Sequence, residues 1–168
     1  MKGEPVGLPQ GFYTYLGRDN GPVEGWIGST DVDLRMLAGG QEARLLSDFA
    51  YVDAYGFLHR ARTGLVFDGG SKPWWTWPIV GHPWNEYLPA YVIHDQQCDD
   101  IRVARDLGAI SADVARQHRR ISDNLFREGM TWLKRNKLNR AGSWVRRLEV
   151  QVKYLAVRLH AWRTLGIW

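Results

Sequence analysis

The sequence predicts an α+β fold, with a small N-terminal antiparallel sheet followed by a three-helix C-terminal part, in a single domain over residues 1–168. Short β-rich runs separated by turn signals occupy residues 1–70. A loop rich in Trp and Pro follows over 71–89. Over 90–168, apolar residues recur at spacings of three and four, the period of an amphipathic helix. The length of 168 residues suits one domain.

Two turn signals divide the strand half. They are Asp19-Asn20-Gly21 and Asp53-Ala54-Tyr55-Gly56, both typical of chain reversals. Between and after them lie the strands we expect, at Val23 to Ile27, Ala50 to Val52 and Leu65 to Phe67.

Three helices account for the second half. The first begins near Glu86 and ends at the break Leu107-Gly108-Ala109. The second begins at the N-cap Ser111 and runs to about Lys137, and the third covers Ser143 to about Leu165. The apolar stripe of the third helix predicts that it packs on the other helices or on the sheet.

Composition narrows the class of protein. Hydrophobic residues make up 45% and charged residues 24%, which excludes wholesale disorder. No apolar run approaches the roughly 20 residues that span a bilayer, so we expect a soluble protein with no transmembrane segment. A single cysteine and the lack of a secretory signal favour a reducing compartment.

Basic residues give the chain a formal charge of +4 and gather in its later part, from Arg116 to Arg163. Such a field attracts anions. A solvated helix surface is the interpretation we favour over a dedicated nucleic-acid or phosphate-binding face.

The densest polar signal is His94-Asp95, within the first predicted helix. Counting by three and four from His94 gives Tyr91, Cys98 and Ile101, so the imidazole follows the apolar stripe and Asp95 lies at its edge. Such a histidine is either a hydrogen-bonded core residue or a catalytic one. Cys98 is interpreted as a packed thiol, because no second cysteine offers a zinc pair.

A second signal is an apolar strand that ends at Asp68 and continues into Gly69, Ser71 and Lys72. Asp68 could bind a metal, orient a histidine or accept a proton, and free backbone N–H groups near Gly69 could meet an oxyanion. The alternative is an Asx-turn that only closes the strand. Trp74 and Trp75 follow, and could stack on a base or a sugar ring.

The third signal is Asp123, an acid beside an apolar flank of the second helix. An ion pair with Arg119 or Arg127, each four residues away, would explain Asp123 without a function. His118 falls on a core-like stripe of the same helix and is a weaker candidate.

The order of these segments carries a resemblance. Along the chain come Gly64-Leu65-Val66-Phe67-Asp68-Gly69-Gly70-Ser71-Lys72-Pro73, then His94-Asp95, then Ser122-Asp123-Asn124-Leu125-Phe126. This order resembles the bacteriophage and prophage family catalogued as domain of unknown function 1353, over residues 44–166. Leu65 stands where that family has Phe, and Gly70 and Lys72 replace Ala and Ile.

The resemblance implies a phage origin and one shared site, but no established reaction. The site would be built from Asp68, Ser71, His94, Asp95 and Asp123.

We therefore expect a small phage-encoded hydrolase, most simply a phosphodiesterase that cleaves a nucleotide or cyclic-nucleotide defence signal in the host cytoplasm. Either His94 is a general base oriented by Asp68 or Asp95, or His94, Asp95 and another carboxylate bind a divalent metal ion that activates water. The residues expected to bind the anionic substrate are Gly69, Ser71, Lys72, Trp74 and Trp75.

Two alternatives stay open. One is a hydrolase that acts on cell-wall peptidoglycan during phage entry or lysis. The other is a non-catalytic protein, either a virion component or a binder that sequesters a ligand, in which His94 and Asp68 only stabilise the fold.

Overall fold

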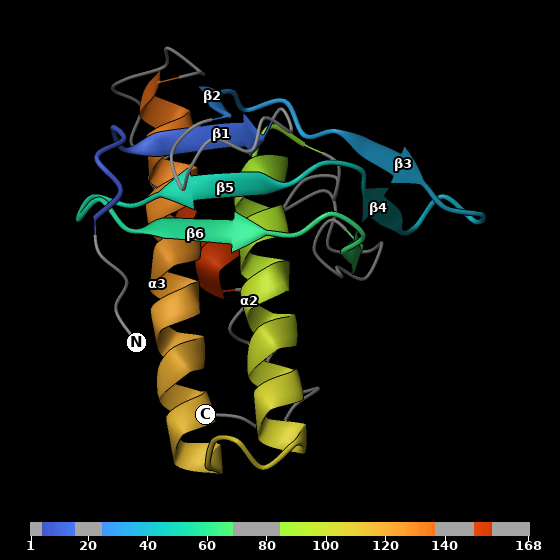
Figure 1. Ribbon diagram of the computed structural model, residues 1–168, viewed down its shortest axis with the longest axis vertical. Helices are drawn as coiled ribbons and strands as arrows, with labels where there is room; N and C mark the ends of the chain where they lie inside the picture. The colour runs from blue at the N-terminus through green and yellow to red at the C-terminus, as the bar shows by residue number, and fades with distance from the viewer. Residues whose placement is uncertain (1–4, 16–24, 69–84, 137–149, 156–168) are drawn as a thin grey trace.

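The computed structural model describes residues 5–15, 25–68, 85–136 and 150–155 (Figure 1). Among the described residues, the strands precede the helices, so the α+β class is confirmed. The strands are β1 (Gly11–Tyr15), β2 (Trp26–Gly28), β3 (Leu34–Met36), β4 (Ala43–Leu45), β5 (Phe49–Val52), β6 (Leu58–Ala61) and β7 (Val66–Phe67). The helices are α2 (Leu88–Asp106) and α3 (Ala112–Asn136), and residues 150–155 are also helical.

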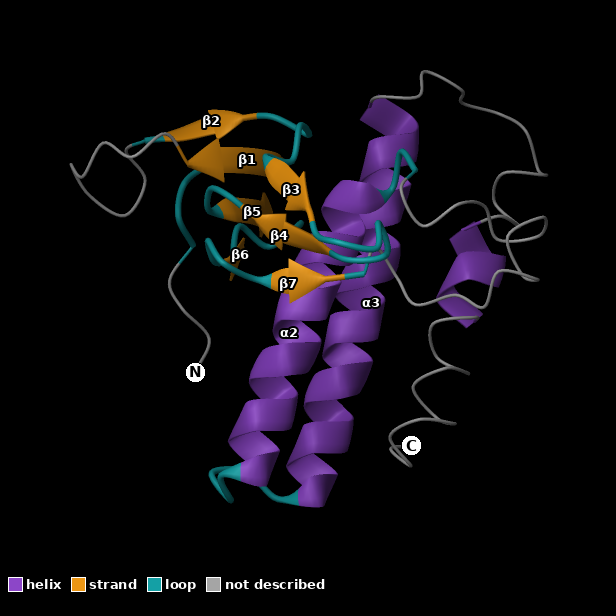
Figure 2. Cartoon of the chain, turned by 90° about the vertical axis from the view of Figure 1, so that its right-hand side faces the viewer, coloured by secondary structure: helices purple, strands orange, loops and turns teal. Residues whose placement is uncertain are grey.

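The strands form two antiparallel sheets where the sequence predicted one. The first has the order β2-β1-β5-β6 and the second the order β3-β4-β7. The chain crosses between them three times, after β2, after β4 and after β6, because β5 returns to pair with β1 and β7 returns to pair with β4. Figure 2 shows both sheets on one side of the α2–α3 pair.

The predicted turn at Asp53 is confirmed and joins β5 to β6. The Asp53 backbone N–H donates to the Phe57 carbonyl, and the Gly56 N–H donates to the Asp53 carbonyl. Gly56 has a φ of +83°, a conformation that glycine adopts without strain. The other predicted turn, at Asp19-Asn20-Gly21, lies outside the described residues.

The boundary between α2 and α3 lies where the sequence predicted it. Gly108 has a φ of +71° just beyond the end of α2. The Ser111 side chain then accepts a hydrogen bond from the Val114 N–H at 3.3 Å, as an N-cap residue does. Of the predicted third helix, residues 150–155 are described and are helical.

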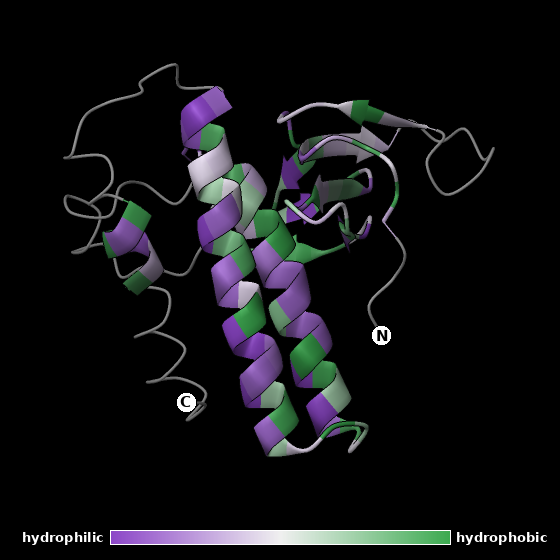
Figure 3. Cartoon of the chain, turned by 90° about the vertical axis from the view of Figure 1, so that its left-hand side faces the viewer, coloured by the Kyte–Doolittle hydropathy of each residue, from purple (hydrophilic) through white to green (hydrophobic). Residues whose placement is uncertain are grey.

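Both helices are amphipathic, and Figure 3 shows apolar and polar residues alternating along them. The placement of His118 on a core stripe was wrong, since His118 is exposed and Ile121 beside it is 62% exposed. The first turns of α3 extend beyond the sheets in Figure 1, so this segment lies beside α2 and no strand covers it.

One hydrophobic core joins both sheets to both helices. Ala43 and Phe67 from the second sheet belong to the same buried cluster as Phe12 and Phe49 from the first. Gly129 of α3 faces this core, where a Cβ atom would lie only 3.2 Å from the Phe12 ring. A side chain at this position would have to displace the Phe12 ring by a few tenths of an ångström, so glycine suits the close approach of α3. No helix among the described residues is long and apolar enough to cross a membrane.

Candidate functional site

The site begins with a buried pair between the two helices. His94, in the middle of α2, is 4% exposed, and its Nε2 lies 3.0 Å from Oδ1 of Asp123 on α3. Asp123 is buried as well. The prediction of an enclosed imidazole is confirmed. Because α2 and α3 lie side by side, two residues 29 positions apart in the chain meet.

Asp123 has a second cationic partner. The Nε of Arg119, one turn earlier on α3, donates to the same Oδ1 at 3.2 Å, which confirms the predicted pair with Arg119. Burial alone would raise the pKa of Asp123, but the hydrogen bonds and charges of His94 and Arg119 outweigh it and lower that pKa. Asp123 is therefore a carboxylate at neutral pH.

His94 has two further neighbours on its own helix. Nδ1 lies 3.7 Å from Oδ1 of Asp95, and Sγ of Cys98 lies 3.7 Å from both ring nitrogens. A sulfur equidistant from both nitrogens lies over the face of the ring. Burial acts to lower the pKa of His94, but Cys98, Asp123 and Asp95 outweigh it and raise that pKa well above its usual value. These three neighbours favour the protonated form of the imidazole.

The carboxylate of Asp95 differs from that of Asp123, because one of its oxygens makes no hydrogen bond within the described residues. Its side chain is 24% exposed, yet its Oδ2 atom is buried and has no hydrogen-bond partner among the described residues. Burial raises the pKa of Asp95, the contacts with His94 oppose the rise, and the charge of Asp68 adds to it. A buried carboxylate with a raised pKa and an unused oxygen is suited to accept a proton.

Asp68 follows β7 and lies near enough to act on the pKa of Asp95. His94 contacts Asp95 and Asp123, and Asp68 acts on Asp95 through its charge. We call these four predicted catalytic residues the acid–imidazole cluster: Asp68, His94, Asp95 and Asp123. The orienting carboxylate, however, is Asp123 and not the predicted Asp68 or Asp95, since Asp123 makes the short contact with the ring. The predicted substrate-binding residues Gly69, Ser71, Lys72, Trp74 and Trp75 lie outside the described residues.

The described residues hold no group of three or more His, Cys, Asp or Glu side chains arranged to bind a metal ion. Within these ranges, the acid–imidazole cluster is a set of ion pairs around one ring. Arg119 belongs to it as well, although the sequence indicated Arg119 only as a partner for Asp123.

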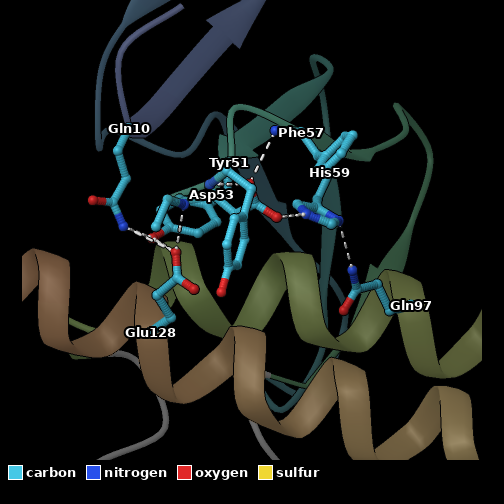
Figure 4. Close-up of polar contacts among 9 residues, drawn as sticks. Gln10, Tyr51, Asp53, Phe57, His59, Gln97 and Glu128 are labelled. Atoms are coloured by element: carbon cyan, nitrogen blue, oxygen red, sulfur yellow. Dashed lines mark hydrogen bonds and ion pairs between the residues drawn. The ribbon is translucent and has the colours of Figure 1, made fainter. Parts of the chain in front are cut away.

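Sequence reasoning missed a second polar network, at the β5–β6 turn. It comprises Asp53, His59, Gln97 and Glu128 with their partners (Figure 4). Asp53 carried a turn signal, but nothing local linked it to the helices. The four residues come from the β5–β6 turn, from β6 and from both helices.

Comparison with known proteins places the chain in a family. The family model described as "Protein of unknown function (DUF1353)" matches residues 43–146, more than half of the chain. The chain belongs to this family. The matched DUF1353 region contains all four residues of the acid–imidazole cluster, and the predicted resemblance is confirmed.

One relative has a segment whose sequence is similar to part of this DUF1353 protein. It is the uncharacterized protein y4jT of Sinorhizobium fredii (strain NBRC 101917 / NGR234), which is 43% identical over 56 residues. The match covers 33% of this chain and 17% of the relative. No solved structure matches the chain.

Proposed function

We propose that this DUF1353 protein is a small hydrolase that cleaves a phosphodiester bond in a nucleotide or cyclic nucleotide. The observation that carries the proposal is the unpartnered, buried Oδ2 of Asp95 beside the His94–Asp123 pair. Leaving such an oxygen unpaired costs about 1–3 kcal/mol or more. That cost is understandable if the oxygen acts on a substrate or a water molecule.

The directions in which the pKa values are shifted suggest a role for each residue in the reaction. Asp95, whose pKa is raised, takes a proton from water while the water oxygen attacks phosphorus. The bond from phosphorus to the leaving oxygen breaks, and Asp95 returns its proton to that oxygen. His94, held as an imidazolium by Asp123, stabilises the negative charge that develops nearby.

The proposed substrate class rests on the positive charge of the chain and on the residues that follow Asp68 in the sequence. The chain has a formal charge of +4, which attracts anions. In this proposal, Gly69, Ser71 and Lys72 contact the phosphate, and Trp74 or Trp75 stacks on the ring. The proposed role, destruction of a defence signal in the host cytoplasm, rests on the phage origin inferred from the sequence.

Mass spectrometry on linear and cyclic nucleotides tests the proposal. Purified protein is incubated with the panel, with and without a chelator, beside the variants His94→Ala and Asp95→Asn. The matched control is Asp99→Asn, one turn along α2, where the carboxylate is exposed and paired with Arg102. We expect one nucleotide to be cleaved by the wild type and by Asp99→Asn, and by neither cluster variant.

The chelator distinguishes the two versions of the mechanism. Cleavage that survives the chelator supports Asp95 as the base. Cleavage that stops assigns the activation of water to a divalent metal ion, whose further ligands would then lie outside the described residues. If no nucleotide is cleaved and purified cell wall is, the substrate class is wrong and the peptidoglycan alternative holds.

The burial of His94 favours a second candidate, a protein that binds and sequesters its ligand. At 4% exposure and with both nitrogens near carboxylates, His94 also suits a purely structural role. Retention of an unchanged nucleotide, together with a lower melting temperature in His94→Ala, would support this candidate against the hydrolase.

A further inference from the structure

The β5–β6 turn is fixed to both helices by the polar network of Figure 4. On the α2 side, Oδ2 of Asp53 lies 3.0 Å from Nε2 of His59, and the Gln97 amide donates to the other ring nitrogen at 3.2 Å. Oδ1 of Asp53 accepts the backbone N–H groups of Tyr55 and Phe57, both at 2.9 Å. The turn thus has little freedom of its own.

On the α3 side, a single oxygen of Glu128 holds the turn. Oε1 accepts from the Gln10 amide at 2.9 Å, the Tyr51 hydroxyl at 3.0 Å and the Ala54 N–H at 2.9 Å. The carboxylate is therefore engaged by three donors. Hydrogen bonds to a charged acceptor are the stronger kind, so this anchor stiffens the turn.

This rigid turn exposes a large aromatic side chain. Tyr55 is 78% exposed at the turn, next to the point where Ala54 is bonded to α3. Tyr55 also lines a concave surface between the sheet edge and the two helices, together with Phe57, Arg127, Thr131, Trp132 and Arg135. A fixed, exposed ring at the edge of a concave surface is a platform on which a planar group can stack.

Two arginines on this surface are available to an anion. Its acidic side chains have internal partners: Asp53 and Glu128 as given above, and Asp100 with Arg62 and Gln96. Arg127 and Arg135 have no carboxylate partner among the described residues, and Arg127 lies over the ring of Tyr154. These two arginines are eight positions apart on α3, or about 12 Å along the helix.

We propose that this concave surface binds single-stranded nucleic acid. Arg127 and Arg135 contact successive stretches of the phosphate backbone, and Tyr55 stacks on an unpaired base. A duplex suits the surface less well, because its bases are already stacked on one another and do not offer a free face to Tyr55. The inference does not depend on the acid–imidazole cluster, which none of these three residues contacts.

Fluorescence anisotropy with a labelled oligothymidylate of about 12 nucleotides tests the proposal. Titrations at about 50 mM and about 200 mM salt compare the wild type with Arg127→Gln/Arg135→Gln, Tyr55→Ala and Tyr55→Phe. Arg116→Gln is the matched control, since Arg116 is on the same helix but is paired with Asp113 and does not line the surface. Far-UV circular dichroism checks that each variant is folded.

We expect the double arginine variant and Tyr55→Ala each to bind roughly tenfold more weakly than the wild type, with Tyr55→Phe and Arg116→Gln unchanged. The slope of log affinity against log salt should fall by roughly 1.4 in the double variant, which is two phosphate contacts on a single strand.

Three results would overturn the proposal. They are the absence of binding by the wild type, an equal loss in Arg116→Gln and in the double variant, and tighter binding of the corresponding duplex. Because binding is measured without turnover, failure here leaves the hydrolase proposal standing.

Discussion

Two carboxylates in contact with the same imidazole have pKa values shifted in opposite directions. Asp123 is beside Arg119 and its pKa is lowered, whereas Asp95 is near Asp68 and its pKa is raised. Such a division is how a site obtains a permanent charge and a proton acceptor from one residue type. The environment of each carboxylate thus decides its role.

The His94–Asp123 pair predicts a pH window for stability. The raised pKa of His94 contributes stability that is complete below 6.5 and is lost as pH rises through the folded value. The lowered pKa of Asp123 contributes stability that is complete above 3.8 and is lost as pH falls through its folded value. The pair is therefore fully stabilising between pH 3.8 and 6.5.

Chemical denaturation of His94→Ala across pH measures this contribution. Inside the window, we expect the free energy of unfolding to fall by about 3 kcal/mol, because Asp123 loses a buried partner. The exposed His118→Ala is the control and should change it by no more than about 0.5 kcal/mol. A loss that is the same at every pH would contradict an ionised pair.

We expect the Asp95 carboxylate to lower the stability of the fold and to be needed for activity. Replacing Asp95 by Asn removes a carboxylate that burial and Asp68 make costly to ionise, and keeps an oxygen toward His94. We expect Asp95→Asn to gain about 1 kcal/mol in unfolding free energy at pH 7 and to lose turnover. In the control Asp99→Asn, both quantities should stay at the wild-type level. A less stable Asp95→Asn would assign that residue a structural role.

At the scale of elements, Glu128 attaches a turn, a strand and the N-terminal segment to one helix. We expect Glu128→Ala to reduce the unfolding free energy by about 2 kcal/mol, since three donors lose their acceptor. Glu128→Gln keeps an amide oxygen in place and should cost less than half as much. Urea denaturation compares both with Glu42→Gln, an exposed control. Equal losses in Ala and Gln would show that charge, and not acceptance, sets the cost.

The elements that the sequence predicted well carry their signals locally. Gly108 and Ser111 mark the boundary of the two helices, and Asp53 with Gly56 marks a hairpin turn, because each acts within a few residues. The candidate residues His94, Asp95 and Asp123 were also predictable as polar positions beside apolar stripes. That Asp123 would be the residue to hold His94 was not, because helix packing decides it.

Across the whole molecule, one core predicts one unfolding transition. Residues of both sheets and both helices belong to the same buried cluster, so no part of it has a core of its own. We expect thermal melting followed by far-UV circular dichroism and by tryptophan fluorescence to give coincident midpoints. Two separate midpoints would mean that the second sheet, β3-β4-β7, is stable apart from the rest.

The features that sequence reasoning missed at this scale all depend on long-range placement. The division of seven strands into two sheets follows from pairing between β1 and β5 and between β4 and β7. Each of these strands has five residues or fewer, too short for its pattern to specify a partner. The hydrogen bonds of His59, Gln97 and Glu128 likewise form only once the sheet lies on the helices, so the sequence does not indicate them.

The anchor at Glu128 also determines when the β5–β6 turn can dock during synthesis of the chain. Its oxygen collects donors from residues 118, 77 and 74 positions earlier in the chain. A chain leaving the ribosome presents the strands and their turn long before their acceptor has been synthesised. The β5–β6 hairpin therefore docks late, after most of α3 has emerged, and until then its polar groups are bonded to water. Contacts of such long sequence separation slow folding, so the surface around Tyr55 is completed only once this late docking step has taken place.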